Sequence, residues 1–150
     1  MSPPLSIFIK AAMQVTTSVL MTESAAMLLA TVLLHSLDLQ DSTLLSHNQQ
    51  LVHFLNGADH SNPPDWTIKP YTQIIYSLLA ATTSSIRKIR RSQNQMADLL
   101  ARQALTVYHA NHINISRVCT NPQHVQECPV LVALQSVTIN SVMVLTASCC

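Results

Sequence analysis

The sequence predicts a mixed α/β fold, in which helices flank a sheet. Two observations support this class. Short segments rich in β-branched residues alternate with longer segments whose apolar residues recur at helical spacing. Apolar residues make up 48% of the chain and charged residues 10%. A chain of 150 residues with this composition can bury one core, and hardly two.

The chain is expected to begin with a hairpin and a long helix. Residues 5–10 and 13–20 are short, β-branched and separated by little, so they are predicted as two paired strands. The segment 22–37 is predicted as a helix, because an apolar run follows Thr22, which suits its N-cap.

Two shorter elements and a loop are expected next. Residues 42–47 form a short apolar run between polar neighbours and are predicted as a strand. Residues 48–56 are predicted as a helix that ends at Gly57, because glycine suits a left-handed cap. The segment 58–66 contains two prolines and turn-forming Asn and Asp residues, so it is predicted as a loop.

A helix, a strand and a last helix complete the pattern. Pro70 suits the first turn of a helix, residues 84–91 are predicted as a strand, and Asn94 as the N-cap of the last helix. The apolar stripes of the two helices are Tyr71, Ile74, Ile75, Leu78 and Leu79, and Met96, Leu99, Leu100, Ala104 and Val107. After this helix, no regular succession of strands and helices is recognised. The sequence therefore predicts a domain over 1–107 and a tail over 108–150.

Composition excludes several classes of protein. A single glycine excludes the glycine-rich phosphate loops of dinucleotide-binding proteins and P-loop enzymes. The four cysteines all lie at or after Cys119, which does not suit a small disulfide-bonded secreted domain, and no secretory signal is recognised. We therefore expect an intracellular protein with no transmembrane segment, no membrane partner and no small-molecule cofactor.

Charge is distributed unevenly along the chain. Residues 66–126 contain seven of the eight Lys and Arg residues and one of the seven acidic residues, which gives this segment +6 and the rest −5. Such a split indicates either a basic face that meets a polyanion or an ordinary mixed surface.

Two carboxylates stand out in the sequence, and for the first, on an apolar helix face, an unpaired charge would be costly. Glu23 shares the apolar face of the helix predicted over 22–37, and Asp98 is the one acidic residue of the basic segment. The polar face of the first helix is expected to be Ser24, Thr31 and His35. Each carboxylate also has a structural explanation. Glu23 would be stabilised by the helix dipole in the first turn, and Asp98 would form an ion pair with Arg102 four residues later.

Four segments carry a family resemblance: "ESAAMLLATVLLHSL", "TLLSHNQQLVHFLNG", "DWTIKPYTQIIYSLL" and "IRKIRRSQNQMADLLARQAL". In this order they resemble the RNase H type-1 domains of plant retroelements, which accompany reverse transcriptases, from about residue 5 to residue 107. The most specific piece is "RSQNQMADLLARQA". The resemblance implies an RNase H-like mixed sheet with flanking helices.

The resemblance also implies a site and a chemistry. In that family four carboxylates hold two divalent metal ions, and Glu23 matches the second and Asp98 the fourth. The implied cofactor is Mg²⁺ or Mn²⁺, and the implied partner is an RNA–DNA hybrid. Two such ions, roughly 4 Å apart, would activate a water and stabilise the leaving oxygen of a phosphodiester.

The sequence departs from the family pattern at the other two carboxylates. His47 stands at the position of the third, and a neutral imidazole is a poor Mg²⁺ ligand. The chain begins at what resembles the second strand, so the first, central strand and its Asp are expected to be missing. Two of four ligands should not sustain catalysis. Either the open strand edges close on each other, or residues 129–145 fill the gap.

Nucleic-acid contacts are expected from a basic cluster: Arg87, Lys88, Arg90, Arg91 and Arg102. The alternative is a solvated edge strand protected by its charges. Aromatic residues are only 4% of the chain, so no base-stacking platform is predicted beside the cluster. The tail carries possible zinc ligands at unusual spacings, and no zinc site is expected there. They are His109, His112, Cys119, His124 and Cys128.

Three functions are compared. The first, which we prefer, is a catalytically degenerate RNase H-like module that binds nucleic acid through residues 87–102. The second is an active RNA–DNA hybrid endoribonuclease in which His47 is tolerated and another chain supplies the missing Asp. The third is a non-enzymatic zinc-binding or interaction protein that acts through the tail.

Overall fold

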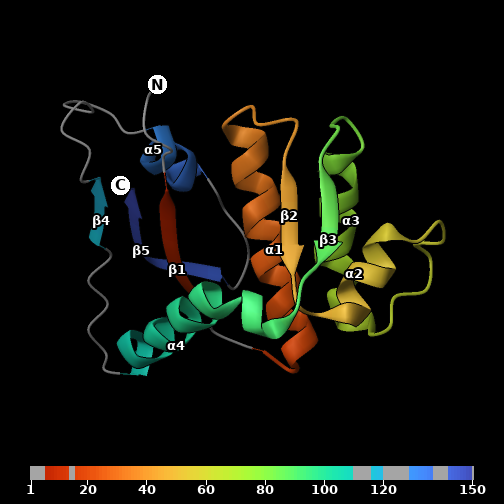
Figure 1. Cartoon of the computed structure of the whole chain (residues 1–150), viewed down its shortest axis with the longest axis horizontal. Coiled ribbons are helices and arrows are strands. Elements are labelled where there is room, and N and C mark those ends of the chain that lie inside the picture. Colours follow the sequence, from red (N-terminus) through yellow and green to blue (C-terminus); the bar gives the residue numbers. More distant parts are fainter. Residues whose placement is uncertain (1–5, 14–15, 110–115, 120–128, 137–141, 150) are drawn as a thin grey trace. The chain divides into compact units, whose positions relative to one another are not determined.

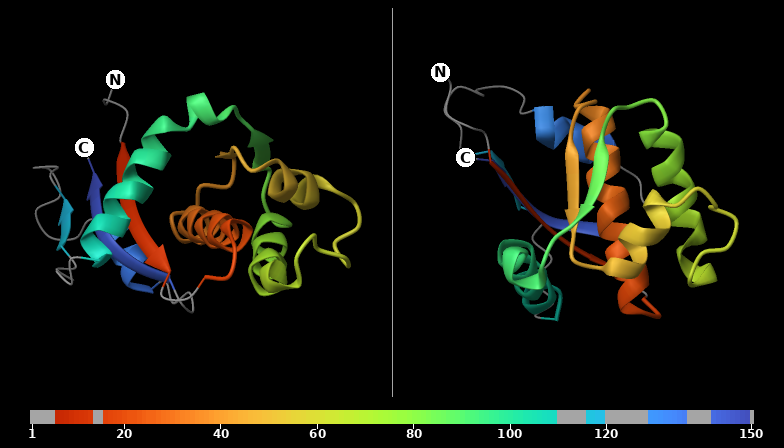
Figure 2. Two further views of the ribbon diagram at one scale, coloured as in Figure 1. Left: turned by 90° about the horizontal axis from the view of Figure 1, so that it is seen from below. Right: turned by 45° about the vertical axis from the view of Figure 1, so that its right-hand side comes forward.

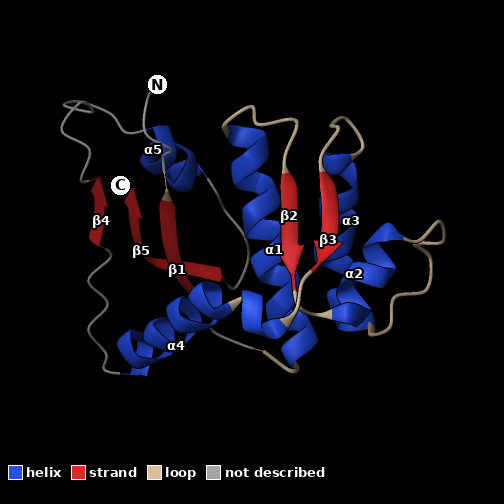
Figure 3. Cartoon of the chain, in the orientation of Figure 1, coloured by secondary structure: helices blue, strands red, loops and turns tan. Residues whose placement is uncertain are grey.

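The chain folds as a mixed α/β protein, the class that the sequence predicts and one compatible with an RNase H-like fold (Figure 3). The computed structural model describes residues 6–13, 16–109, 116–119, 129–136 and 142–149. Contacts divide the chain into a central unit, Val15–Asn94, and a terminal unit, Met1–Gln14 with Gln95–Cys150. These two units are defined by contacts in space, whereas the predicted boundary at residue 107 is where the family resemblance ends. The predicted boundary is therefore not tested and stays a prediction.

The central unit is built on two parallel strands, β2 (Thr43–Ser46) and β3 (Ser85–Lys88), with Leu44 opposite Ile86 in the register. Both of these side chains are buried. The helices of the unit are α1 (Val19–Ser36), α2 (Gln49–Asn56) and α3 (Lys69–Leu79), and a 3₁₀ turn, η1 (Trp66–Ile68), precedes α3. α1 and α3 pack together on one face of the strand pair, and α2 lies alongside β3 (Figures 1 and 2).

Local signals explain the elements of this unit that the sequence located correctly. β2, α2 and α3 lie within a residue or two of their predicted positions, whereas β3 ends at Lys88, earlier than expected. The Asn48 side chain caps α2 by accepting a hydrogen bond from the Leu51 N–H at 3.0 Å. Pro70 lies in the first turn of α3, where its missing N–H has no helical partner to lose.

The start of α1 corrects the predicted hairpin. α1 begins at Val19, and its N-cap is Ser18, whose Oγ accepts from the Met21 N–H at 3.1 Å. The prediction of Thr22 as the cap was therefore wrong, and the segment 13–20 does not form the second strand of a hairpin. Ser18 and Thr22 can both cap a helix, and the cap that adds one more buried turn, including Leu20, is the one used.

The predicted polar face of α1 is also wrong in part. Ser24 and Thr31 are buried, at 0% and 1% exposure, while His35 is exposed. Their hydroxyls donate to the carbonyls of Leu20 and Met27 one turn earlier, at 2.7 and 2.8 Å. Because these bonds satisfy the hydroxyls within the helix, a second side of α1 can be buried.

α1 is unusually apolar for its length. By length and composition alone it could cross a membrane, since its 18-residue window has a mean hydropathy of 1.5. The central helix of a soluble domain passes the same test. In this chain α1 packs against α3, β2 and α2, and it carries the half-buried carboxylate Glu23.

The left-handed backbone conformation that was predicted after α2 is found after α1 instead. Gly57 follows α2 with φ −73°, so the prediction of a left-handed cap there was wrong. The left-handed residue is Asp38 after α1, at φ 55°. The N–H groups of Asp38 and Leu39 bond the carbonyls of His35 and Leu34 at 3.2 and 2.9 Å, which completes a Schellman motif.

The terminal unit contains a sheet in the order β1–β5–β4. β1 (Ile7–Met13) pairs antiparallel with β5 (Val142–Cys149), and β4 (Ser116–Cys119) pairs parallel with β5. Neither expectation for the strand edges is met in the described residues, because β2 and β3 pair only with each other and residues 129–136 form a helix. The tail does supply a strand, β5, which pairs with β1 and β4, and residues 137–141 lie outside the described part of the chain.

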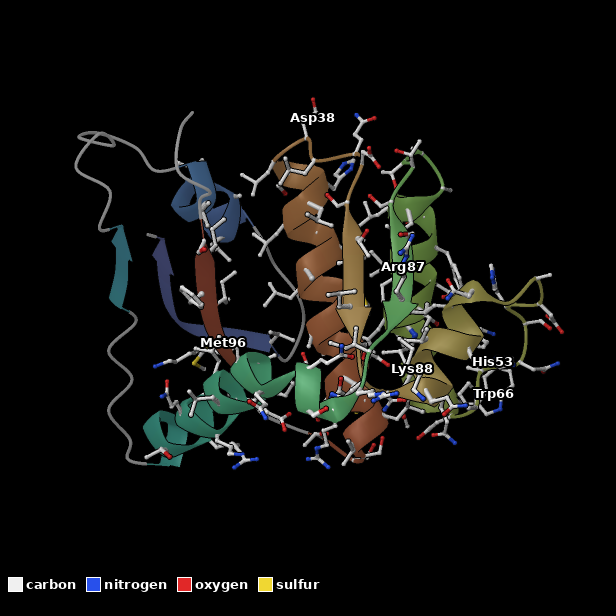
Figure 4. All side chains as sticks on the ribbon, viewed as in Figure 1. Asp38, His53, Trp66, Arg87, Lys88 and Met96 are labelled. Carbon is white, nitrogen blue, oxygen red and sulfur yellow. The ribbon has the colours of Figure 1, made fainter. Side chains whose placement is uncertain are left out.

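The last predicted helix is α4 (Gln95–His109), which contacts β1. Its stripe was predicted correctly at Ala104, which is buried, but Met96 and Leu99 are 56% and 49% exposed (Figure 4). The side chain of Val107 lies outside the described residues. A further helix that was not predicted, α5 (Pro129–Ser136), buries Val130, Ala133 and Leu134.

Candidate functional site

One end of the central unit gathers most of the predicted site. β2 and β3 run parallel and finish at this end, and α1, α2 and α3 all begin there (Figure 1). We call it the site end. Ligands of open α/β sheets bind outside the carboxyl ends of the strands, where helix N-termini also favour anions. Glu23 in the second turn of α1 and His47 directly after β2 belong to this end.

The structure brings Glu23 and His47 together. The His47 Nε2 lies 3.7 Å from Glu23 Oε1, and the two side chains are 19% and 25% exposed. The Ser46 hydroxyl donates to the other carboxylate oxygen, Oε2, at 3.5 Å. Ser46 Oγ in turn accepts from the Asn48 N–H at 3.1 Å, which links this contact to the cap of α2. Both oxygens of Glu23 therefore face polar neighbours.

Asn94 sets the tautomer of His47. Its side-chain Nδ2 lies 2.8 Å from His47 Nδ1. With the amide in this orientation Nδ2 can only donate, so Nδ1 accepts and the proton of a neutral ring lies on Nε2, toward Glu23. The sequence predicted Asn94 as the cap of α4, which it directly precedes. The contact of its side chain with His47 was not predicted.

This donor set does not fit a pair of Mg²⁺ ions. Mg²⁺ requires octahedral oxygen coordination, and the cluster of Glu23, Ser46, His47 and Asn94 contributes one carboxylate. Its two oxygens already meet an imidazole and a hydroxyl. Across the residues that the structure describes, no three His, Cys, Asp or Glu side chains could together hold a metal ion. The implied Mg²⁺ or Mn²⁺ stays a prediction.

Asp98 lies in the first turn of α4, in the terminal unit. Its Oδ2 is 3.8 Å from Arg102 Nη2, so the ion pair that the i,i+4 spacing suggested is formed. Arg102 is 77% exposed and Asp98 23%. The two carboxylates of the predicted metal site thus belong to different units, and the structure describes each by itself.

The basic cluster is exposed. Arg87 and Lys88 at the end of β3, and Arg90 and Arg91 just after it, all present their side chains to solvent. Lys88 Nζ donates to Gln49 Oε1 of α2 at 3.0 Å, which fixes its direction (Figure 4). These four cations are part of the central unit, and Arg102 is part of the terminal unit.

The predicted zinc ligands of the tail fall mostly outside the described residues. This applies to His112, His124 and Cys128. His109 ends α4, and Cys119 ends β4, where it stands opposite Cys149 in the register.

Sequence reasoning missed Trp66. Its side chain is 63% exposed, and Lys69 Nζ lies 4.6 Å from the centre of its ring. The prediction that no aromatic platform accompanies the basic cluster rested on the low aromatic content. The signal that could have identified this residue is local: a tryptophan after "NPPD", with a lysine three residues later.

Comparison with known proteins agrees with the resemblance seen in the sequence. A family described as reverse transcriptase-like matches residues 5–104. No curated protein and no solved structure matches. The matched segment covers α1, β2, α2, α3, β3 and most of α4, and thus both Glu23 and Asp98. The chain belongs to the reverse transcriptase-like family of RNase H-like proteins.

Proposed function

We propose that this chain is a nucleic-acid-binding module of the RNase H-like type that no longer hydrolyses its ligand. One observation supports the proposal: His47, which the resemblance places at the position of the family's third carboxylate, lies next to Glu23. The imidazole is held there from both sides, by Glu23 at 3.7 Å and by Asn94 at 2.8 Å. It contributes no negative charge to retain a divalent cation.

Loss of the carboxylate charge at position 47 would slow the hydrolysis step rather than the binding of the nucleic acid. Two-metal hydrolysis depends on carboxylates that hold both ions close to the scissile phosphate. Replacing one by a neutral ring removes part of the electrostatic stabilisation of the transition state, and a single such contribution amounts to about 3–4 kcal/mol. Binding of a nucleic-acid backbone needs no metal and can persist without catalysis.

The exposed cations supply that binding. Four cations lie within five residues at the site end, where three helices also begin: Arg87, Lys88, Arg90 and Arg91. Cations and helix N-termini both attract phosphate groups without reading sequence. We propose an RNA–DNA hybrid as the partner and a retroelement reverse transcriptase as the source, both on the resemblance of the motif around Asp98.

A cleavage assay tests the loss of activity. The purified chain is incubated with an end-labelled RNA–DNA hybrid and millimolar Mg²⁺ or Mn²⁺, and no cleavage above the protein-free control is expected. Cleavage that Asp98→Asn abolishes would contradict the proposal and favour an active endoribonuclease. The Asp98→Asn control is required because it separates this chain's own activity from a contaminating nuclease.

A salt titration tests the binding surface. Affinity for the hybrid, measured by fluorescence anisotropy, should fall steeply with salt, with a log–log slope of about −0.9 for each phosphate that a cation neutralises on duplex DNA. Lys88→Gln should weaken binding and reduce the slope by roughly one. Lys10→Gln in β1 is the matched control, because it removes one positive charge from the terminal unit and should leave the slope unchanged. Absent or salt-independent binding would overturn this part.

A further inference from the structure

Trp66 is the single tryptophan of the chain, and it lies at the site end beside the start of α3. Figure 4 shows it at the same end of the central unit as Lys88, at the opposite end from Asp38. Its 63% exposure leaves most of the indole in contact with solvent. A large aromatic side chain exposed at the carboxyl ends of strands is a candidate binding surface.

The backbone around Trp66 is fixed rather than loose. Asp65 Oδ1 accepts hydrogen bonds from the Thr67 N–H at 2.8 Å and from the Thr67 hydroxyl at 2.7 Å. These bonds hold the pKa of Asp65 below its ordinary value. Ile68 and Tyr71, the next apolar residues, are 0% and 9% exposed and anchor the turn in the core. The hydrogen-bonded turn and its buried neighbours therefore hold the Trp66 side chain in an exposed position.

The loop that leads to Trp66 is held by a second set of contacts. The ring of His60 stacks on Tyr76 with a centroid distance of 3.4 Å and an angle of 16°. The Tyr76 hydroxyl donates to the Phe54 carbonyl at 2.9 Å, and His60 Nε2 lies 2.6 Å from the Gly57 carbonyl oxygen. α2, the loop and α3 are therefore joined by aromatic contacts before the chain reaches Trp66.

Lys69 places a positive charge beside the exposed indole of Trp66. Its Nζ lies 4.6 Å from the indole centre, close enough for a cation–π interaction. An ammonium beside an exposed indole matches a nucleotide, whose base stacks on the ring while its phosphate meets the cation. A flat apolar ligand would use the ring alone, and a protein groove would require a broader apolar surface.

We propose that Trp66 and Lys69 bind an unpaired nucleotide of a single-stranded nucleic acid. The proposal rests on the nucleic-acid binding proposed above and extends it: the basic cluster holds a phosphate backbone, and Trp66 adds stacking to an unpaired base. Ligands with a single-stranded overhang are therefore preferred over blunt duplexes of the same length.

The unique tryptophan makes the test direct. An unlabelled oligothymidylate of about fifteen nucleotides is titrated into the full chain, and the intrinsic tryptophan fluorescence is expected to be quenched at saturation. An abasic oligomer of equal length and charge should bind through the cations yet cause little quenching. Equal quenching by both oligomers would show a charge effect without stacking and would overturn the proposal.

Variants separate this site from the basic cluster. With a labelled oligothymidylate, Trp66→Ala should weaken binding about 5- to 150-fold, the range for loss of one stacked base, and Trp66→Phe should recover part of the affinity. Lys69→Gln should weaken binding less. Leu39→Ala is the matched control, because Leu39 is also an exposed apolar residue, 49% exposed, and lies after α1.

The outcomes also separate the two proposals. If the chain binds blunt hybrid in a salt-dependent manner but Trp66→Ala binds oligothymidylate normally, the stacking site is wrong and the proposed function stands. If neither ligand binds, both proposals are wrong. If Trp66→Ala loses affinity for blunt hybrid and oligothymidylate equally, the preference for unpaired bases is wrong. Circular dichroism of each variant verifies that it is folded.

Discussion

The two ends of the central unit are built from the same helices and strands but satisfy their polar groups differently. At the opposite end, the connections α1–β2 and α3–β3 are joined through one carbonyl: Gln40 O accepts from the Thr83 N–H at 3.0 Å and from the hydroxyls of Thr83 and Ser84 at 3.1 Å each. At the site end, side chains of Glu23 and His47 contact each other instead.

The difference indicates which end is available for a ligand. Groups that bond backbone atoms fix the connections and have little capacity left for another molecule. Exposed cations and an exposed indole contribute little to the stability of the fold, and exposed groups of this kind are candidates for binding a ligand. The opposite end closes the fold, and the site end retains groups that a nucleic acid can use.

The largest effect should come from the core that both ends share. Ile75 in α3 is 0% exposed, so Ile75→Ala should destabilise the fold by about 2–5 kcal/mol through lost burial and a cavity. Its neighbour Ile74 is 46% exposed, and Ile74→Ala should change stability by no more than about 0.5 kcal/mol. Urea unfolding measures both. Similar losses for the two variants would mean that α3 does not pack as described.

A change at the site end should make stability depend on metal. His47→Asp places a second carboxylate next to Glu23, and the repulsion between the two like charges should cost about 1–3 kcal/mol in chelator. Millimolar Mn²⁺ should restore part of this loss, seen as a rise in melting temperature. His47→Asn is the control, since it adds no charge and should show no response to Mn²⁺. A wild-type response as large as that of His47→Asp would contradict the metal argument.

The contact that supports the Trp66 loop should be sensitive to alkaline pH. Burial raises the pKa of Tyr76 from 10.0 to about 12. The unfolded chain therefore releases this proton first, and the free energy of unfolding should decline as pH rises from about 10 to about 12. Tyr76→Phe removes this component, and it also costs about 0.5–1.5 kcal/mol at neutral pH through the lost bond to Phe54 O.

Urea unfolding of wild type and Tyr76→Phe across this pH range measures the difference between them, which cancels the titration of other groups. A constant difference between the two proteins would mean that the partial burial of Tyr76 does not raise its pKa.

The smallest effect is expected at the opposite end and is favourable. Asp38 adopts φ 55°, which glycine tolerates better, so Asp38→Gly should stabilise the fold by about 0.5 kcal/mol. Binding of nucleic acid should be unchanged, because Asp38 lies far along the unit from Lys88 (Figure 4). Thermal melting and the anisotropy assay measure the two quantities. A change in affinity without a change in stability would show that the opposite end also meets the ligand.

Local sequence signals predicted most of the central unit, and their failures have physical causes. Asn48 and Pro70 identify helix starts through local effects. The Asn48 side chain accepts a hydrogen bond from a free N–H of the first turn, and Pro70 has no N–H that would need a partner. The β-branched run 13–20 was misread as the hairpin partner of the first strand, because that strand, β1, pairs instead with β5 from far along the chain. Ser24 and Thr31 were assigned to solvent because a hydroxyl that bonds its own helix looks polar in sequence.

The candidate site was predictable to the extent that a motif carried it. Glu23, His47 and Asp98 were found through a family pattern, and the first two lie together. The contact between His47 and Asn94 joins residues 47 positions apart and could not be read from spacing. Trp66 was missed because exposure of an aromatic residue is decided by which neighbouring apolar residues, here Ile68 and Tyr71, take the buried positions.

The pairing of β1 with β5 has a consequence for how the chain is made. Ile7 stands opposite Cys149, so the terminal unit cannot close until residue 149 has left the ribosome. The central unit, whose strands and helices are contiguous in sequence, can form co-translationally, while β1 waits as an unpaired strand. Until then, the free hydrogen-bonding groups of β1 are open to pairing with strands of other molecules.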